Sequence, residues 1–519
     1  MSQNPAAASH EATTPAPRAA ARPAAREVAA LIAVALLGAL HLPYPFEWDQ
    51  ATFLTGARVL AHGGTLYRDW WDVKQPAIYA FYVAAGRMFG FSESGVHALE
   101  LLWMLALACA VTLALRARDA HAAWLAPLLT VGIYWAAVGP WHLTQVEGLV
   151  GLPLWLATAW ASLAAEGRSP WRALLAGLAG AVVLLFKLAL APVVALVWLV
   201  ALVHAATRAR APAGRIAVGF VLPALVGLAV PLALVIAHEA RLGLLPTLRW
   251  TTFTYPGYLL SQVRGTRVNV LFDGLSWFAL RWSPVLALAA AGAAGAWRAR
   301  DRLGLCLIAC IAAGAAVVLA QRTSWWQYHW LLLDPPLGVL AAFGASALWR
   351  ALPESRGARR LAGVFAAMLF LAPGVLALEK LTLLARDRFA LGPAHARVHQ
   401  ERVSELYQRV DAEVAFLDSA GARPGSLFVI DDPVYYLRSG RAAATALRGV
   451  RFYPFMRPAE WDSLGRQLRA DPPVYVLVES EFAPLVNDSA AAAPVRALLA
   501  RDYRPLRRDA RGEWWERAR

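Results

Sequence analysis

The chain has 519 residues, 59% of them hydrophobic, and a mean hydropathy of +0.46, which excludes an ordinary water-soluble globular protein. The net charge of +15 comes without any motif that stacks bases or reads a groove, so the composition does not indicate a nucleic-acid-binding protein. All three cysteines lie inside apolar runs, which excludes a disulfide framework and a zinc site.

Residues 1–26 are rich in alanine and proline, a composition typical of disorder, and predict a disordered cytoplasmic tail. The apolar run that follows has no convincing cleavage site, so it predicts a membrane anchor rather than a removed signal peptide. Residues 27–380 carry the long apolar runs and predict a transmembrane domain, and residues 381–519 predict a second domain.

Eleven apolar runs predict transmembrane helices, because backbone polar groups in lipid must bond within the helix itself. Arginine clusters lie between these runs at every second connection. If all the clusters are cytoplasmic, the N-terminus is cytoplasmic and the C-terminal domain lies outside. This topology predicts a multi-pass membrane protein with its C-terminal domain on the outer side. The runs are 27–43, 96–115, 122–138, 148–165, 171–186, 188–206, 216–237, 276–297, 304–320, 329–349 and 361–380.

The first outer loop, residues 44–95, is expected to contain two short interfacial helices. Phe53, Leu54, Ala57 and Leu60 share one face of a helix over 50–61. The apolar segment 77–89 is too short for a span, and counting it as one would invert every later loop.

Sparse polar residues collect at the outer rim, where charged groups are costly and usually functional. Glu47 and Asp49 follow the first span directly, and a carboxylate there can act as a general base. The ordinary alternative is a solvated boundary residue. Only three of the 50 basic residues are lysine, and two of these, Lys74 and Lys187, fall at the rim. Each could bind a phosphate oxygen, and Lys187 could equally snorkel from a helix end.

The segment after Asp387 predicts a small α/β domain. An amphipathic helix is expected over 401–419, buried strands over 426–431 and 474–480, and helices near 461–468 and 495–500. Asp431 and Asp432 close the first strand, and plain turn chemistry is the ordinary reason for acids at that place. The predicted fold class is therefore a mainly α, polytopic membrane protein with a small C-terminal α/β domain.

The run EWDQATFLTGARVLAHGGTLYRDWWDVKQPAIYAFY resembles the first outer loop of the GT-C glycosyltransferases, such as the protein mannosyltransferases and lipid A aminoarabinose transferases. That loop has an Asp-Glu pair, then Gly and Tyr, then Lys-Pro-Pro before a short apolar helix. In this chain Asp49-Gln50 takes the place of the acidic pair, and Lys74-Gln75-Pro76 takes the place of Lys-Pro-Pro. Gln50 therefore replaces the second acid, and Gln75 replaces the first proline. The middle element matches Gly63, Gly64 and Tyr67.

Further segments along the chain are similar to such enzymes in the same order. HLTQVEGLVGLPLW brings Glu147, LLFKLALAP brings Lys187, and QRTSWWQYHWLLLDPP brings Tyr328 and His329. DDPVYYLRSGRAAAT resembles the outer domain of bacterial members.

The resemblance implies an inverting transfer of a sugar from a polyprenyl-phosphate donor, such as undecaprenyl phosphate, to a glycan, lipid or protein acceptor on the periplasmic face. Asp49 would be the base, with Glu47 as assistant. A single displacement needs the base and a cation on opposite sides of the sugar, a geometry that Asp49 and Lys74 could meet across the interfacial helix. The donor phosphate would bind Lys74, Lys187, Arg249 or Arg267, and the substrates would contact Tyr67, His142, Glu147, Tyr328 and His329.

No cofactor is required by this reading. A divalent cation could be held by Asp49, Glu47 and Glu147, although no spacing demands it. Two other functions stay open. One is a transporter or flippase of polyprenyl-linked lipids, which predicts internal repeats and charges at the middle of the membrane. The other is a non-catalytic envelope assembly protein. The sugar, the acceptor and the oligomeric state also stay open.

Overall fold

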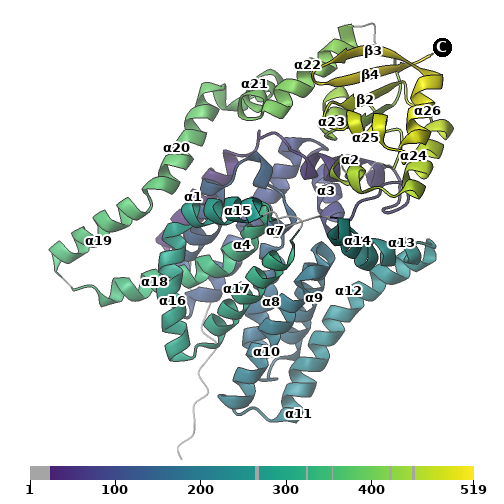
Figure 1. The fold of residues 1–519 in the computed structure, drawn as a ribbon. Helices are drawn as coiled ribbons and strands as arrows, with labels where there is room; N and C mark the ends of the chain where they lie inside the picture. Colours follow the sequence, from purple (N-terminus) through teal and green to yellow (C-terminus); the bar gives the residue numbers. More distant parts are fainter. Residues whose placement is uncertain are drawn as a thin grey trace, which may run out of the picture.

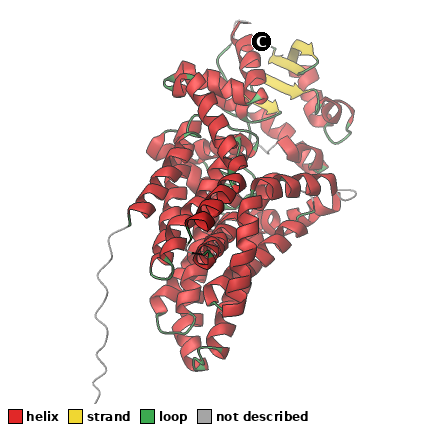
Figure 2. Cartoon of the chain, turned by 90° about the vertical axis from the view of Figure 1, so that its left-hand side faces the viewer, coloured by secondary structure: helices red, strands yellow, loops and turns green. Residues whose placement is uncertain are grey.

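The computed structural model describes residues 24–262, 268–322, 325–353, 355–419, 423–446 and 450–518. The tail predicted to be disordered lies almost wholly outside these residues. The described chain forms a helical body with a small mixed domain at one end, where the only strands of the described residues gather (Figures 1 and 2).

Seven helical segments of the described chain are long and apolar enough to cross a membrane, and two bent helix pairs raise the number to nine. The seven are Glu93–Arg116 (α4), Ala120–Ala137 (α5, η1 and α6), Val146–Ala164 (α7 and α8), Leu188–Thr207 (η3 and α10), Ala213–Arg241 (α11, η4 and α12), Arg302–Ala320 (α17) and Gln327–Ala351 (η6 and α18). The bent pairs are Val268–Arg281 (α15) with Ser283–Ala299 (α16), and Arg356–Leu369 (α19) with Leu371–Arg386 (α20). Two shorter helices, Ala25–Ala39 (α1) and Pro170–Phe186 (α9), occupy the remaining predicted runs.

The predicted spans 276–297 and 361–380 fall on the two bent helix pairs, where the chain bends by 79° and 54°. A proline explains each bend, since its ring clashes with the carbonyl four residues earlier. Pro284 lies four residues after Leu280, next to the end of α15, and Pro373 lies four residues after Leu369, the last residue of α19. At the first bend Trp282 is also fixed by a 2.6 Å hydrogen bond from its indole N–H to Asp334.

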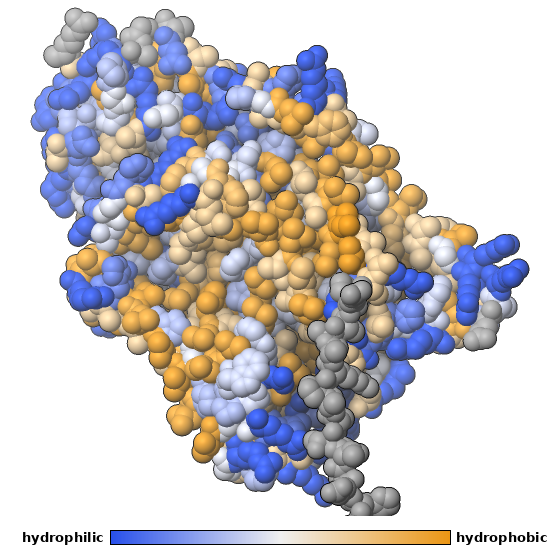
Figure 3. All heavy atoms as spheres, turned by 180° about the vertical axis from the view of Figure 1, so that it is seen from behind, coloured by the Kyte–Doolittle hydropathy of each residue, from blue (hydrophilic) through white to orange (hydrophobic). Residues whose placement is uncertain are grey.

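Large apolar side chains cover the outside of this body, as expected for helices that face lipid. Leu234, Phe365 and Met368 are each more than 60% exposed, on α12 and α19. Figure 3 shows the apolar surface as an orange area over the body, with hydrophilic residues concentrated at the mixed domain and at the far ends. The chain is therefore a multi-pass membrane protein.

Both expected short helices of the first outer loop are confirmed, at Asp49–Ala61 (α2) and Pro76–Phe89 (α3). They pack closely through aromatic rings, and Phe53 of α2 meets Tyr79 edge-on with the ring centres 5.9 Å apart. Gly56 permits this approach, because a Cβ there would lie 2.3 Å from the Trp70 indole nitrogen. That nitrogen in turn donates to the Tyr79 hydroxyl at 3.0 Å.

The remaining short helices connect these elements. They are Pro140–His142 (η2), Leu245–Arg249 (α13), Trp250–Thr254 (η5), Tyr255–Gln262 (α14), Arg388–Ala390 (η7) and Val450–Phe455 (η8).

The C-terminal domain contains a four-stranded sheet in the order β1-β2-β4-β3. The predicted strands appear as Leu427–Ile430 (β1) and Tyr475–Glu479 (β2), which are parallel and fully buried. The hairpin of Tyr503–Asp509 (β3) and Gly512–Arg517 (β4) was not predicted, and it pairs antiparallel with β2 through β4. The helices are Pro393–Val403 (α21), Glu405–Ser419 (α22), Val434–Ser439 (α23), Pro458–Ala470 (α24), Ala483–Asp488 (α25) and Ala493–Asp502 (α26).

Candidate active site at the outer loops

The Asp49 carboxylate stands at the first residue of α2, where the helix dipole favours negative charge. Its Oδ2 lies 3.3 Å from the Lys74 ammonium and accepts a hydrogen bond from the Tyr328 hydroxyl, also at 3.3 Å. The side chains of Asp49 and Lys74 are 29% and 25% exposed, so both reach solvent. Three predicted site residues, separated by 25, 254 and 279 positions in sequence, thus meet at one point.

The expected separation of Asp49 and Lys74 across a sugar is not what the structure contains. The two groups form a direct ion pair, because unlike charges in a part-buried site attract strongly. A gap of 3.3 Å leaves no room for a sugar between them, so a bound substrate would have to open this pair.

Gln50, which replaces the second acid of the Asp-Glu pattern, has a structural role. Its buried amide nitrogen donates to the carbonyls of Pro140 and Leu143, both at 2.7 Å, and its oxygen accepts from the Glu47 backbone N–H at 2.7 Å. The side chain therefore ties the first outer loop to the second. A carboxylate cannot donate, so this connection needs an amide.

A second cluster of polar and charged side chains lies around Lys187. The Lys187 ammonium, just after α9, contacts Glu147 Oε1 of α7 at 2.6 Å and Gln321 Oε1 at 2.7 Å. His329 Nε2 of η6 lies 3.6 Å from the same Glu147 oxygen. The structure thus brings together Glu147, Lys187 and His329, all three of which were predicted from the sequence.

The electrostatics of Lys74 join the two groups. Burial lowers the pKa of Lys74, but the negative charges of Asp49, Asp72 and Glu147 outweigh it and hold the pKa above its usual value. Tyr328 bonds to Asp49, and the adjacent His329 lies against Glu147, so we treat the Asp49 cluster and the Lys187 cluster as one candidate site.

Two residues hold the loop that carries Lys74, one that was predicted as a site residue and one that was not. Tyr67, a predicted substrate contact, donates its hydroxyl to the Lys74 backbone carbonyl at 3.0 Å, so it positions the lysine. Sequence reasoning missed Asp72, whose buried carboxylate accepts from the Tyr79 hydroxyl at 2.8 Å. Burial raises the pKa of Asp72 against the opposing effect of Lys74. Its place two residues before Lys74 was the available signal.

The C-terminal domain holds the three residues that precede Asp49. The Phe46 N–H donates to the Tyr407 hydroxyl at 2.9 Å, and Glu47 Oε1 accepts from the Ser404 hydroxyl at 3.1 Å. Burial raises the pKa of Glu47, and the Ser404 bond opposes that shift. Glu47 thus faces the domain, on a different set of partners from Asp49.

Trp48 completes this contact and has an unusual backbone, with φ 49° and ψ −103°, a region that non-glycine residues rarely adopt. Its N–H donates to Asp432 Oδ2 at 2.9 Å, while Asp432 Oδ1 accepts from the Val434 N–H at 2.9 Å. The second contact is the expected turn chemistry, and the first is a link between domains that sequence reasoning missed. Burial raises the pKa of Asp432 to about 7.

His142 lies beside the site rather than in it. Its ring stacks on Trp277 with centres 4.3 Å apart, its Nδ1 accepts from the Gly139 N–H at 3.2 Å, and its Nε2 donates to Gln327 at 3.0 Å. Burial lowers the pKa of His142 to about 4, so it is neutral and holds Gln327 in place.

The two predicted arginines are not joined to the described site. Arg249 is exposed on α13, with no ion pair to either carboxylate of the site in the described part of the chain. Arg267 lies outside the described residues.

A buried network below the site was also missed. Glu100 of α4 accepts from the Thr144 N–H at 2.7 Å and from the Tyr134 hydroxyl at 2.6 Å. Tyr82 of α3 donates to the Thr144 hydroxyl at 2.8 Å. Because Thr144 comes three residues before Glu147, these bonds set the position of the second outer loop.

Among the described residues, no three His, Cys, Asp or Glu side chains lie close enough together to hold a metal ion. The three carboxylates named as a cation set have different partners: Asp49 and Glu147 each pair with a lysine, and Glu47 bonds to Ser404.

No protein-family model matches this chain, and no curated relative matches its sequence. Its fold matches the crystal structure of ArnT from Cupriavidus metallidurans bound to undecaprenyl phosphate, with a TM-score of 0.61 at 17% sequence identity. The match covers 94% of this chain and 97% of that one. The chain therefore shares the fold of that ArnT structure over nearly its whole length.

Proposed function

We propose that this protein is an inverting glycosyltransferase of the bacterial inner membrane that moves a sugar from a polyprenyl-phosphate donor to an acceptor on the periplasmic face. The observation that carries the proposal is the part-exposed Asp49 carboxylate, held by Lys74 and Tyr328 at the start of α2. A fold shared with a protein bound to undecaprenyl phosphate supports the donor class.

Asp49 acts as the general base in this proposal. The hydroxyl or amine of the acceptor passes its proton to an Asp49 oxygen while its lone pair attacks the anomeric carbon. The bond from that carbon to the phosphate oxygen breaks, and its electron pair leaves with the polyprenyl phosphate. One displacement inverts the configuration at the anomeric carbon.

Lys74 and Lys187 are the proposed partners of the donor phosphate, because an ammonium stabilises the charge that develops on the leaving oxygen. Each lysine is occupied by a carboxylate in the present structure. Binding of the phosphate would replace Asp49 as the partner of Lys74, which separates base and cation and leaves the carboxylate available to the acceptor. Tyr328 would keep Asp49 oriented during that exchange.

The test uses the full chain in nanodiscs with a panel of radiolabelled undecaprenyl-phosphate sugars and a cell-envelope extract as acceptor source. Wild type should release sugar from at least one donor, and Asp49→Asn should lose release by at least about a hundredfold, as for loss of a general base. Asp69→Asn is the matched control, since Asp69 is an exposed acid of the same loop paired with Arg68. Full activity of folded Asp49→Asn would remove Asp49 as the base. Lipid movement across the bilayer without sugar release would favour the flippase.

A further inference from the structure

An open groove of about 630 Å³ lies between the first outer loop and the C-terminal domain. Its lining comes from three places: Trp48 before α2, one face of α22, and the turn between β3 and β4. The lining residues are Trp48, Glu405, Leu406, Gln408, Arg409 and Arg511. Its volume is in the range of about 300–1,000 Å³ that is usual for small-ligand sites.

The groove is lined by both polar and apolar surface, and its charges are largely balanced. Glu405, Gln408 and Arg409 are spaced i, i+3 and i+4, so they share one face of α22. Arg409 is fixed by Glu479 at 2.6 Å and by Asp431 at 3.4 Å, and Arg511 lies 3.4 Å from Glu413. These carboxylates offset both guanidinium charges. A strongly anionic ligand is therefore not favoured over a neutral one.

A lipid tail does not suit this lining, because charged and amide groups interrupt the apolar surface of Leu406 and the Trp48 ring. One half-buried indole beside planar amide, carboxylate and guanidinium groups suits a pyranose. The indole offers an apolar face to the C–H side of the sugar, and the polar groups exchange hydrogen bonds with its hydroxyls.

The groove is connected to the candidate base through the chain, because its lining residue Trp48 is the neighbour of Asp49 in sequence. Trp48 lines it and precedes Asp49 in the chain, and the Asp432 hydrogen bond fixes the Trp48 backbone. Ser404, next to Glu405 at the start of α22, bonds to Glu47. The same short segment therefore carries both the Trp48 ring of the groove and the Asp49 carboxylate.

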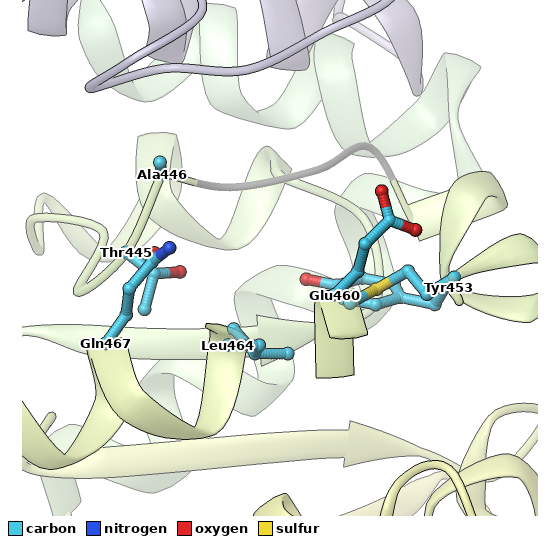
Figure 4. Close-up of a pocket in the computed structure, with 7 residues that line it drawn as sticks. Thr445, Ala446, Tyr453, Glu460, Leu464 and Gln467 are labelled. Atoms are coloured by element: carbon cyan, nitrogen blue, oxygen red, sulfur yellow. The ribbon is translucent and has the colours of Figure 1, made fainter. Parts of the chain in front are cut away.

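A second cavity of the described residues is much smaller than this groove. It lies within the C-terminal domain, between Thr445, Tyr453, Glu460, Leu464 and Gln467 (Figure 4). Its volume of about 10 Å³ holds no more than one water molecule. This cavity is too small for a sugar, whereas the groove at Trp48 is large enough.

We propose that this groove binds the acceptor as a neutral carbohydrate chain, with the hydroxyl that is to be glycosylated directed toward Asp49. The proposal rests on the proposed function, because it gives Asp49 the role of base. It narrows the acceptor from a glycan, a lipid or a protein to a carbohydrate recognised by Trp48 and the α22 face.

The experiment measures binding without catalysis. Saturation-transfer NMR on the full chain in nanodiscs uses a fixed panel of neutral di- and trisaccharides, with a phosphorylated disaccharide and an uncharged peptide as comparison probes. Gln408→Trp fills the groove, and Gln262→Trp, at an exposed glutamine of α14, is the matched control. We expect at least one neutral sugar to bind wild type and the control, with affinity for Gln408→Trp lower by about tenfold or more.

The outcomes separate this proposal from the catalytic one. Sugar binding that is retained in Asp49→Asn but lost in Gln408→Trp supports the groove, whether or not Asp49→Asn proves inactive. If no sugar binds wild type, if Gln408→Trp binds as well as the control, or if only the phosphorylated or peptide probe binds, the groove proposal is overturned. Loss of transfer in Asp49→Asn would still support the base in those cases.

Discussion

Replacing Gln50 by glutamate would restore the acidic pair of the GT-C pattern, and the structure predicts that it destabilises this protein. The Gln50 amide nitrogen donates to two carbonyls at 2.7 Å, and the side chain is fully buried. A carboxylate would place its oxygens against the carbonyls of Pro140 and Leu143. The introduced side chain must therefore take up a proton or break the link between the two outer loops.

The loss of stability can be calculated for the variant whose introduced carboxyl group is protonated. A carboxyl with an ordinary pKa of about 4.3 that stays neutral at pH 7 costs about 4 kcal/mol. The neutral acid can donate only one of the two hydrogen bonds, and the lost bond adds about 1 kcal/mol. We expect Gln50→Glu to lose about 5 kcal/mol of stability at pH 7 and about 2 kcal/mol at pH 5, because protonation is cheaper at the lower pH.

The assay is thermal unfolding of purified protein in nanodiscs at pH 7 and pH 5, followed by tryptophan fluorescence. Gln262→Glu introduces the same charge at an exposed position and should stay within about 0.5 kcal/mol of wild type. A Gln50→Glu variant as stable as Gln262→Glu at pH 7 would refute the structural role of the amide. A loss of stability in Gln50→Glu that grows as the pH falls would also refute it.

Three further predictions concern Lys74, Asp432 and Gly56. Lys74→Met should raise the KM for the polyprenyl-phosphate donor by about tenfold or more and lower kcat, measured by steady-state kinetics, because the leaving phosphate loses its cation. The folded pKa of Asp432 lies near 7, above its unfolded value, so its contribution to stability is present below about pH 4 and is lost as the pH rises to about 7. Asp432→Asn should flatten that part of the stability–pH curve by up to about 4 kcal/mol, measured by unfolding across pH 4–8. Gly56→Ala should destabilise by about 1–3 kcal/mol, because its Cβ would lie 2.3 Å from Trp70, whereas Gly363→Ala, with open space around it, should not.

Each of these predictions has a contrary result. An unchanged donor KM in Lys74→Met would move the phosphate site to Lys187. A stability curve of the same slope in Asp432→Asn would show that Asp432 does not titrate between pH 4 and 7. Equal stability of the two alanine variants would mean that the aromatic cluster beside α2 can shift without cost.

Local sequence was enough to predict the membrane helices. In lipid each apolar run must satisfy its own backbone hydrogen bonds, so hydropathy alone implies a helix, and all eleven runs are helical in the described chain. The short helices of the first outer loop and the strands β1 and β2 followed from the same local periodicity. The roles of individual site residues, the direction of the termini and the substrates stay predictions.

The β3–β4 hairpin was not predicted from the sequence, because its first strand, YRPLRRD, has no clear alternation of apolar and polar residues. It is a strand because it pairs with β4, whose Trp514 is buried and bonds to Glu413 of α22 at 2.7 Å. Pairing between strands is a tertiary effect, and β-propensity reflects that context more than the residues themselves.

Tertiary structure also decided which polar residues belong to the site. Sequence placed Asp49, Lys74 and Tyr328 on the same side of the membrane, but only the folded chain brought one Asp49 oxygen within 3.3 Å of both partners. It likewise turned Asp432 from an expected turn residue into the partner of the Trp48 backbone, 384 positions away. Local sequence determines secondary structure in lipid because the hydrogen bonds there are local, whereas an active site depends on contacts between distant segments that only the folded chain creates.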